Sequence, residues 1–138
     1  MALRHKAREC ALQMLYQWEM TGVEPARVEA SFWKTARGAP DTKSFANKLL
    51  EGTVAGSAEA DRLIAQHAQN WRVERLAAID RNILRLAVYE LLAGENPAKV
   101  VINEAIELVR TYSESAAGPF VNGILDAIRK SLPAPEKV

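Results

Sequence analysis

The chain has 138 residues, about the length of one domain, and 49% of them are hydrophobic while 25% are charged. This composition is typical of a folded globular protein and excludes disorder of the whole chain. The formal net charge is +1, which favours no class of partner by itself. A single cysteine, Cys10, excludes an intrachain disulfide, and two histidines argue against a structural zinc site. We therefore expect a reducing, cytoplasmic setting, with no metal, no other cofactor and no membrane span.

Apolar residues recur at spacings of three and four residues along nearly the whole chain, a period that predicts α-helices. We expect about seven helices in a compact all-α bundle, because the predicted loops between them are short. The predicted helices cover residues 2–20, 25–37, 41–56, 57–71, 78–93, 98–112 and 119–132. Residues 1–132 are expected to form one domain, and residues 133–138, which begin Pro-Ala-Pro, a short flexible tail.

Particular residues are expected to mark the ends of these helices. Asp41 and Ser57 are predicted N-caps, because a short polar side chain can bond the free N–H groups of a first turn. Gly22 and Gly94 are predicted to end the first and fifth helices, since glycine accepts the left-handed backbone that follows many helices.

The predicted helix 78–93 is apolar nearly all round, which indicates a central, buried helix. Glu90 falls on its apolar side, near Ile83 and Leu86. An unpaired buried carboxylate is very costly, so we expect Glu90 to bond an arginine or backbone amides.

No enzyme is predicted. The chain has no Gly-rich nucleotide-binding loop, no His-Glu-x-x-His and no Gly-x-Ser-x-Gly, and its carboxylates are scattered. We interpret Cys10 as a plain buried cysteine and His67 as a hydrogen-bonded core histidine.

The first predicted helix opens with basic residues, which oppose the helix macrodipole and are locally unfavourable. Such exceptions are expected at functional sites. Cations can hold phosphates, and an exposed aromatic ring can stack on an unpaired base, so this helix predicts binding to single-stranded RNA. The alternative is a solvated basic chain end. The residues concerned are Arg4, His5, Lys6 and Arg8, followed on the outer face by Glu9, Gln13 and Tyr16.

A second group of charges lies on the polar stripe of the helix 78–93. Arg81 and Arg85 are one turn apart there, near Asp80 and Asn82. With the outer face of the helix 98–112 they form a predicted mixed-charge patch that a protein partner could bind. That outer face carries Asn103, Glu104, Glu107 and Arg110. Ordinary solvated helix surface is the alternative.

Four segments in order resemble the NusB family of bacterial transcription antitermination factors. They are RECALQMLYQW at 8–18, DRNILRLAVYEL at 80–91, VINEAIEL at 101–108 and FVNGILD at 120–126. The resemblance implies an all-helical fold of two packed subdomains and no catalysis. It also implies binding to the boxA RNA of ribosomal RNA leaders, a heterodimer with the ribosomal protein NusE, and entry into the RNA polymerase antitermination complex.

The resemblance assigns roles to particular residues. The RNA-binding residues it implies, together with the outer face of the first helix, are Arg4, His5, Lys6, Arg8, Gln13, Tyr16 and Phe120. The partner-binding residues are Asp80, Arg81, Arg85 and Glu104. Phe120 lies on the flank of its helix, where it can face the core or solvent. Residues 116–119, Ala-Ala-Gly-Pro, lack the charges that the family often carries there.

Two other interpretations remain open at this stage. The chain could be a helical protein-interaction module without RNA binding, or a homodimer in which a second copy occupies the partner face.

Overall fold

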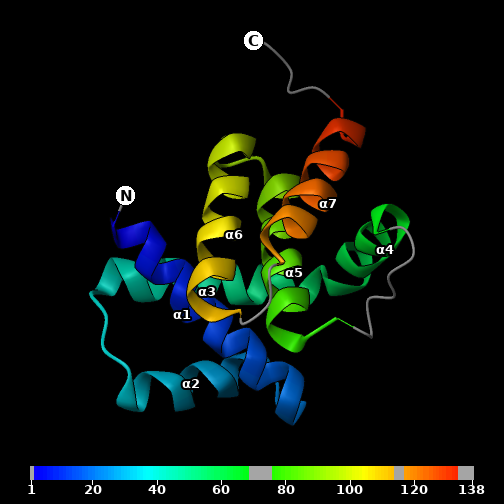
Figure 1. Cartoon of the computed structure of the whole chain (residues 1–138). Coiled ribbons are helices and arrows are strands. Elements are labelled where there is room, and N and C mark those ends of the chain that lie inside the picture. The colour runs from blue at the N-terminus through cyan, green and yellow to red at the C-terminus, as the bar shows by residue number, and fades with distance from the viewer. Residues whose placement is uncertain (1, 69–75, 114–116, 134–138) are drawn as a thin grey trace.

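The computed structural model describes residues 2–68, 76–113 and 117–133. This part of the chain contains seven α-helices and no strand, which confirms the all-α prediction (Figure 1). The helices are α1 Ala2–Thr21, α2 Pro25–Thr35, α3 Pro40–Ala55, α4 Ser57–His67, α5 Ala78–Ala93, α6 Ala98–Tyr112 and α7 Gly118–Ser131. The predicted continuation of the fourth helix to Trp71 and most of the predicted tail, 134–138, lie outside the described residues.

Glycine ends two of the helices as predicted. Gly22 and Gly94 have φ angles of 70° and 68°, in the left-handed region that disfavours other residues. The predicted N-caps are wrong. The N-cap positions of α3 and α4 are Ala39 and Gly56, neither of which has a polar side chain that could cap the helix. Asp41 instead lies inside the first turn of α3, where its charge complements the macrodipole.

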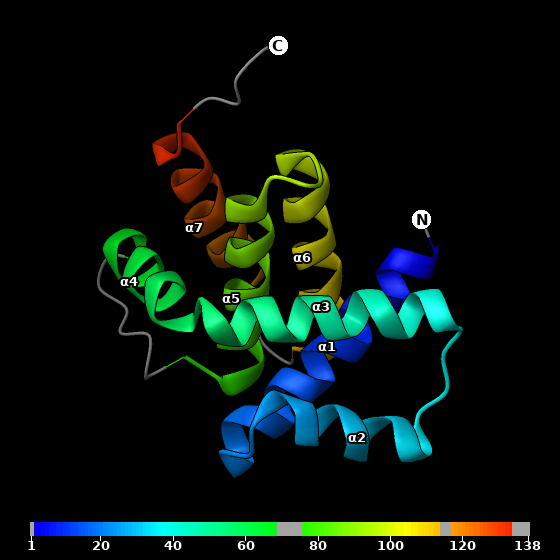
Figure 2. The same cartoon turned by 180° about the vertical axis from the view of Figure 1, so that it is seen from behind.

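The helices form two packed groups. Helices α1, α2 and α3 contact one another, and α5, α6 and α7 pack side by side with α4 against α5 and α7. Figure 2 shows α3 crossing in front of α1 and α5, and it packs against both, so that it spans the two groups. The two packed helical subdomains expected from the resemblance are therefore present.

Helix α5 occupies the centre of the molecule. It packs against α1, α3, α4, α6 and α7, as its apolar circumference predicts. Its largest fully buried side chains are Ile83, Leu84 and Leu86. They meet Leu12, Met14 and Leu15 of α1 and Leu125 and Ile128 of α7 in one continuous core. None of the helices among the described residues is long and apolar enough to cross a membrane.

Candidate nucleic-acid interface

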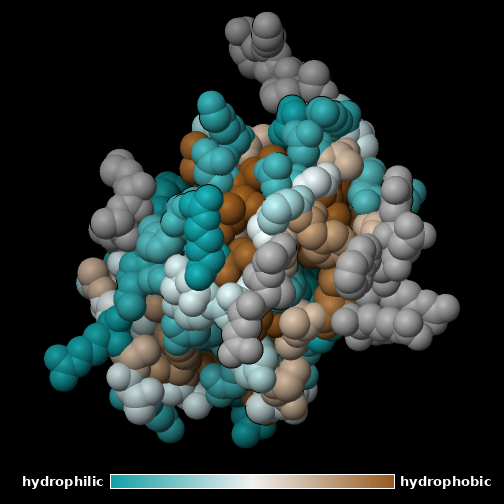
Figure 3. Space-filling view, in the orientation of Figure 1, coloured by the Kyte–Doolittle hydropathy of each residue, from teal (hydrophilic) through white to brown (hydrophobic). Residues whose placement is uncertain are grey.

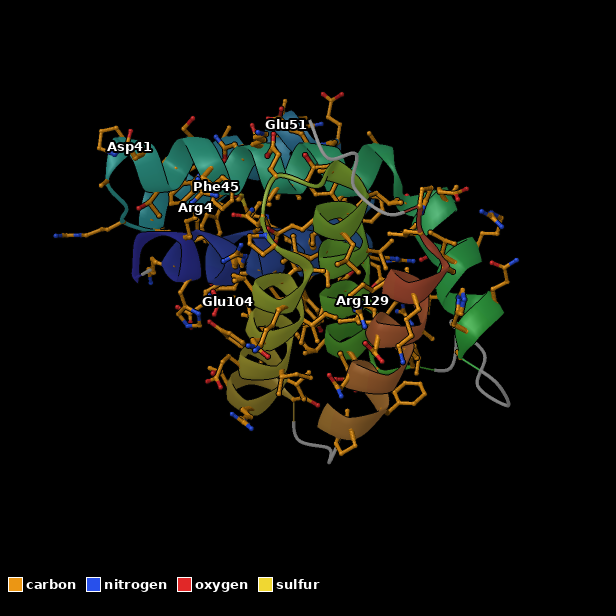
Figure 4. All side chains as sticks on the ribbon, turned by 90° about the horizontal axis from the view of Figure 1, so that it is seen from above. Arg4, Asp41, Phe45, Glu51, Glu104 and Arg129 are labelled. Carbon is orange, nitrogen blue, oxygen red and sulfur yellow. The ribbon has the colours of Figure 1, made fainter. Side chains whose placement is uncertain are left out.

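The first turns of α1 lie between α3 and α6. In Figure 4, Arg4 extends toward Phe45 of α3, while Glu104 of α6 lies on the other side of α1. Arg4 and Lys6 are exposed and His5 is half-buried, so these three predicted site residues are accessible. Figure 3 shows hydrophilic surface over this end of α1 and the adjoining face of α6.

The expectation that Arg8 is exposed with its basic neighbours is wrong. Arg8 is only 2% exposed. The Arg8 guanidinium donates from Nε and Nη2 to the two carboxylate oxygens of Glu90, at 2.8 and 2.9 Å, and from Nη1 to Glu104 at 3.0 Å. Arg8 follows Lys6 by only two positions, but the helical turn rotates it inward among α5 and α6. Phosphate could reach this guanidinium only by displacing the carboxylates.

Glu90 is paired as expected, with an arginine. It is 4% exposed and forms a two-pronged ion pair with Arg8. Burial lowers the pKa of Arg8, but the hydrogen bonds and charges of Glu90 and Glu104 outweigh it and leave that pKa raised. Arg8 therefore stays charged, and the pair fixes the rotation of α1 about its axis relative to α5.

A polar ridge runs along the outer face of α1. His5 Nδ1 lies 3.3 Å from Glu104, and His5 Nε2 lies 3.6 Å from Glu9. One turn further on, Gln13 Nε2 donates to the Tyr112 hydroxyl of α6 at 3.3 Å. The prediction that these residues share an outer face with Tyr16 is confirmed, since Gln13 and Tyr16 are both exposed.

Tyr16 presents a ring to solvent. It is 43% exposed, which places it among the few large apolar side chains at the surface of the described residues. An exposed ring on a polar helix face that has cations at one end can stack on a nucleic-acid base. Tyr112, at the end of α6, is half-buried and adds its hydroxyl to the same ridge, a contribution that helical periodicity does not reveal.

Phe120 lies in the first turn of α7. It is half-buried and packs against the core. Its position is therefore intermediate between the core and solvent, the two orientations that its place on the flank of the helix allowed. Of the neighbouring residues that lack the charges common in the family, Ala117 is buried, and Ala116 lies outside the described residues.

The predicted surface patch on α5 is largely internal, which corrects the expectation for Asp80 and Arg85. Asp80 is 6% exposed and Arg85 9%. Arg85 donates to both oxygens of Asp61 in α4, at 2.7 and 2.8 Å, and to Glu19 of α1 at 3.0 Å. The end of α1 and helix α4 cover this side of α5, and opposite charges pair there.

Glu19 connects this network to α1. Arg81 Nε donates to it at 2.7 Å and Asn82 Nδ2 at 3.1 Å. Burial raises the pKa of Glu19, but the bonds and charges of Arg81 and Arg85 outweigh it and lower that pKa overall. Sequence reasoning missed Glu19 and Asp61, because each lies on a different helix from its partners and no spacing rule joins them.

Cys10 and His67 have the surroundings of structural side chains. Cys10 is buried as expected, and burial raises the pKa of its thiol despite the nearby Lys6. His67 is half-buried, and its Nδ1 lies 2.9 Å from the Leu63 carbonyl oxygen of the same helix. Among the described residues there is no group of three or more His, Cys, Asp or Glu that could hold a metal ion.

Comparison with known proteins decides the family. The family model that matches the chain is that of the NusB family, over residues 5–130. The chain belongs to the NusB family. A transcription antitermination protein NusB of Solibacter usitatus is 44% identical over 137 residues, covering 98% of this chain and 94% of the relative. The NusB family is one of transcription antitermination factors and not of enzymes.

Two solved structures agree with this assignment. NusB of T. maritima matches with a TM-score of 0.82 and 33% identity, over 93% of this chain and 91% of that chain. A crystal structure of antitermination factors NusB and NusE in complex with double-stranded RNA matches with a TM-score of 0.84 and 32% identity. That match covers 96% of this chain and 99% of the other.

Proposed function

We propose that this member of the NusB family is a transcription antitermination factor that acts in the cytoplasm. In this proposal it binds boxA-type RNA together with a NusE-type ribosomal protein, and the pair joins RNA polymerase. The observation that carries the RNA part is the exposed ridge of α1, which combines cations with an exposed ring. A NusB neighbour of similar fold was solved with NusE and RNA, which supports the choice of partners.

The RNA would follow the ridge from the first turn of α1 toward α7. Arg4, His5 and Lys6 would hold phosphates, because exposed cations near one helix end attract a polyanion. Further along, Gln13 would bond a base or sugar and Tyr16 would stack on a base. Phe120 is half-buried at the start of α7 and would contact the RNA with the edge of its ring.

Arg8 has a different role in this proposal from the one its position in the basic segment predicts. Its guanidinium is already bonded to Glu90 and Glu104. It therefore supports RNA binding by holding α1 in place, and the phosphates are left to its exposed neighbours.

For the protein partner, we propose the outer face of α6 as the contacting surface, with the largely buried charges of α5 supporting it from within. Because Asp80 and Arg85 are buried, they would not contact the partner directly. Together with Arg81 they would hold the helices beneath the contacting surface in place. Glu104 is half-buried beside Arg8 and His5, at the border with the RNA ridge. Direct contacts would come from the exposed α6 residues Asn103, Glu107 and Arg110.

The test is fluorescence anisotropy with a boxA-like RNA strand and a scrambled strand, with and without the NusE-type partner, at two salt concentrations. We expect selective binding to the boxA-like strand, strengthened by the partner. Equal, weak binding to both strands with no effect of the partner would leave a helical interaction module. Light scattering on the same sample distinguishes a monomer from a homodimer.

A pair of lysine variants localises the site. Lys6→Ala should weaken RNA binding and flatten its dependence on salt, by roughly 0.7 in the log–log slope for one phosphate of a single strand. Lys34→Ala, an exposed lysine in the last turn of α2, is the matched control and should change neither quantity. Equal effects of the two variants would contradict the assignment of the site to α1.

A further inference from the structure

Arg4 is held in a defined position by residues outside α1. Its Nη1 donates to the side-chain oxygen of Asn96, in the connection between α5 and α6, at 3.0 Å. Its guanidinium carbon also lies 4.7 Å from the centre of the Phe45 ring of α3. Figure 4 shows Arg4 and Phe45 directed toward each other across the space between α1 and α3.

Asn96 is itself oriented by the buried ion pair. Its Nδ2 donates to Glu90 Oε1 at 3.3 Å, and the same oxygen accepts from Arg8 Nη2 at 2.9 Å. Because the amide nitrogen points to Glu90, the amide oxygen points toward Arg4. The contacts thus form a chain from Arg8 through Glu90 and Asn96 to Arg4.

The aromatic contact reinforces this chain. The Phe45 ring has the Arg4 guanidinium at 4.7 Å and the Arg8 guanidinium at 5.9 Å. A ring face attracts a guanidinium and restricts its rotation without consuming an N–H donor. Among the described residues, the Asn96 bond occupies Nη1, so Nε and Nη2 of the exposed Arg4 can still donate to phosphate.

We propose that Phe45 and Asn96 are positioning residues for RNA binding, which hold Arg4 ready to contact the RNA backbone. A long arginine side chain loses rotamer freedom when it binds, and fixing it beforehand reduces that cost. This inference rests on the proposed RNA-binding function. It adds α3 and the α5–α6 connection to the elements that build the site.

The first test is a double-mutant cycle measured by RNA anisotropy with the full chain. We expect Arg4→Ala to weaken binding roughly two- to fivefold, and Asn96→Ala by a smaller factor, since a partly exposed charge contact is worth up to about 1 kcal/mol, a factor of about five. In the Arg4→Ala background, Asn96→Ala should have no further effect. Arg129→Ala, an exposed arginine of α7 in an ion pair with Asp126, is the matched control and should bind like the wild type.

The second test separates positioning from packing at Phe45. Phe45→Tyr keeps an aromatic ring and should retain wild-type binding, whereas Phe45→Leu keeps apolar bulk and should weaken it. Thermal unfolding of each variant shows whether it is folded. A Phe45→Leu protein that binds RNA as tightly as the wild type would overturn the role of the ring.

The outcomes distinguish this inference from the function on which it rests. If the wild type binds RNA selectively but Arg4→Ala binds equally well, or Asn96→Ala weakens both backgrounds by the same factor, the positioning role is refuted and the RNA-binding function stands. If the wild type binds neither RNA, with or without the NusE-type partner, both are refuted.

Discussion

The buried pair of Arg8 and Glu90 allows a quantitative prediction about stability. Both residues are at most 4% exposed, and each is hydrogen-bonded to the other through two atoms. Removing one partner of such a pair leaves a buried charge without compensation, which costs about 3–5 kcal/mol. Arg8→Met should therefore destabilise the protein by about that amount, and Glu90→Leu by less, because Arg8 would keep its bond to Glu104.

The double variant should behave differently from the sum of its parts. Arg8→Met with Glu90→Leu removes both charges and fills their space with apolar atoms, which is often close to neutral for buried pairs. We expect the double variant to lie within about 1–2 kcal/mol of the wild type. Glu104 loses its bond to Arg8 in this variant but is half-buried and remains near His5.

Urea unfolding followed by circular dichroism measures these free energies, provided that the slope m stays constant among the variants. For a chain of this length, Arg8→Met should also unfold roughly 10–15 °C below the wild type. A loss below about 1 kcal/mol for Arg8→Met would refute the reasoning, because surface ion pairs are worth that little. A double variant as unstable as the sum of the singles would refute the pairing.

Three further predictions concern other parts of the molecule. Burial and the nearby Glu51 raise the pKa of Glu29 to about 7, so the free energy of unfolding of the wild type should fall as pH rises from about 4.5 through 7. The fall should be about 1 kcal/mol after allowance for solvent screening. Urea unfolding at pH 5 and pH 8 should show this fall for the wild type and not for Glu29→Gln. If the difference in stability between the wild type and Glu29→Gln were the same at both pH values, the raised pKa of Glu29 would be contradicted. A Cβ on Gly52 would overlap the Tyr89 ring. Gly52→Ala should therefore cost about 1–3 kcal/mol of stability in thermal unfolding, and Tyr89→Leu should relieve that loss. Tyr16→Ala should weaken RNA binding by about 1–3 kcal/mol and leave unfolding nearly unchanged, whereas an equal loss of stability would assign the ring to packing.

The sequence predicted the helices well because their signals are local. Apolar spacing and glycine both act within one or two turns, so α5 and α6 begin and end where expected. The capping predictions failed at Asp41 and Ser57, since proline at the start of α3 and the close succession of α3 and α4 set those boundaries instead. The family resemblance is also a property of sequence, and the comparisons confirm it.

The candidate site was predicted in part. Helical periodicity placed Gln13 and Tyr16 on an accessible face, and both are exposed. The same periodicity could not assign Arg8, because a basic residue near a chain end is compatible with solvent or with a buried acid. Only the packing of α5 and α6 against α1 brings Glu90 and Glu104 to it.

The fold class, the helix order and the need for a partner at Glu90 could be read from the sequence, because they follow from local periodicity and from the cost of a buried charge. The tertiary structure alone decided which cation fills that need and which cations remain at the surface. It also decided that Arg81 and Arg85 pair with Glu19, and that Asn96 meets Arg4. Each of these contacts joins residues far apart in the chain, and their proximity depends on how whole helices pack.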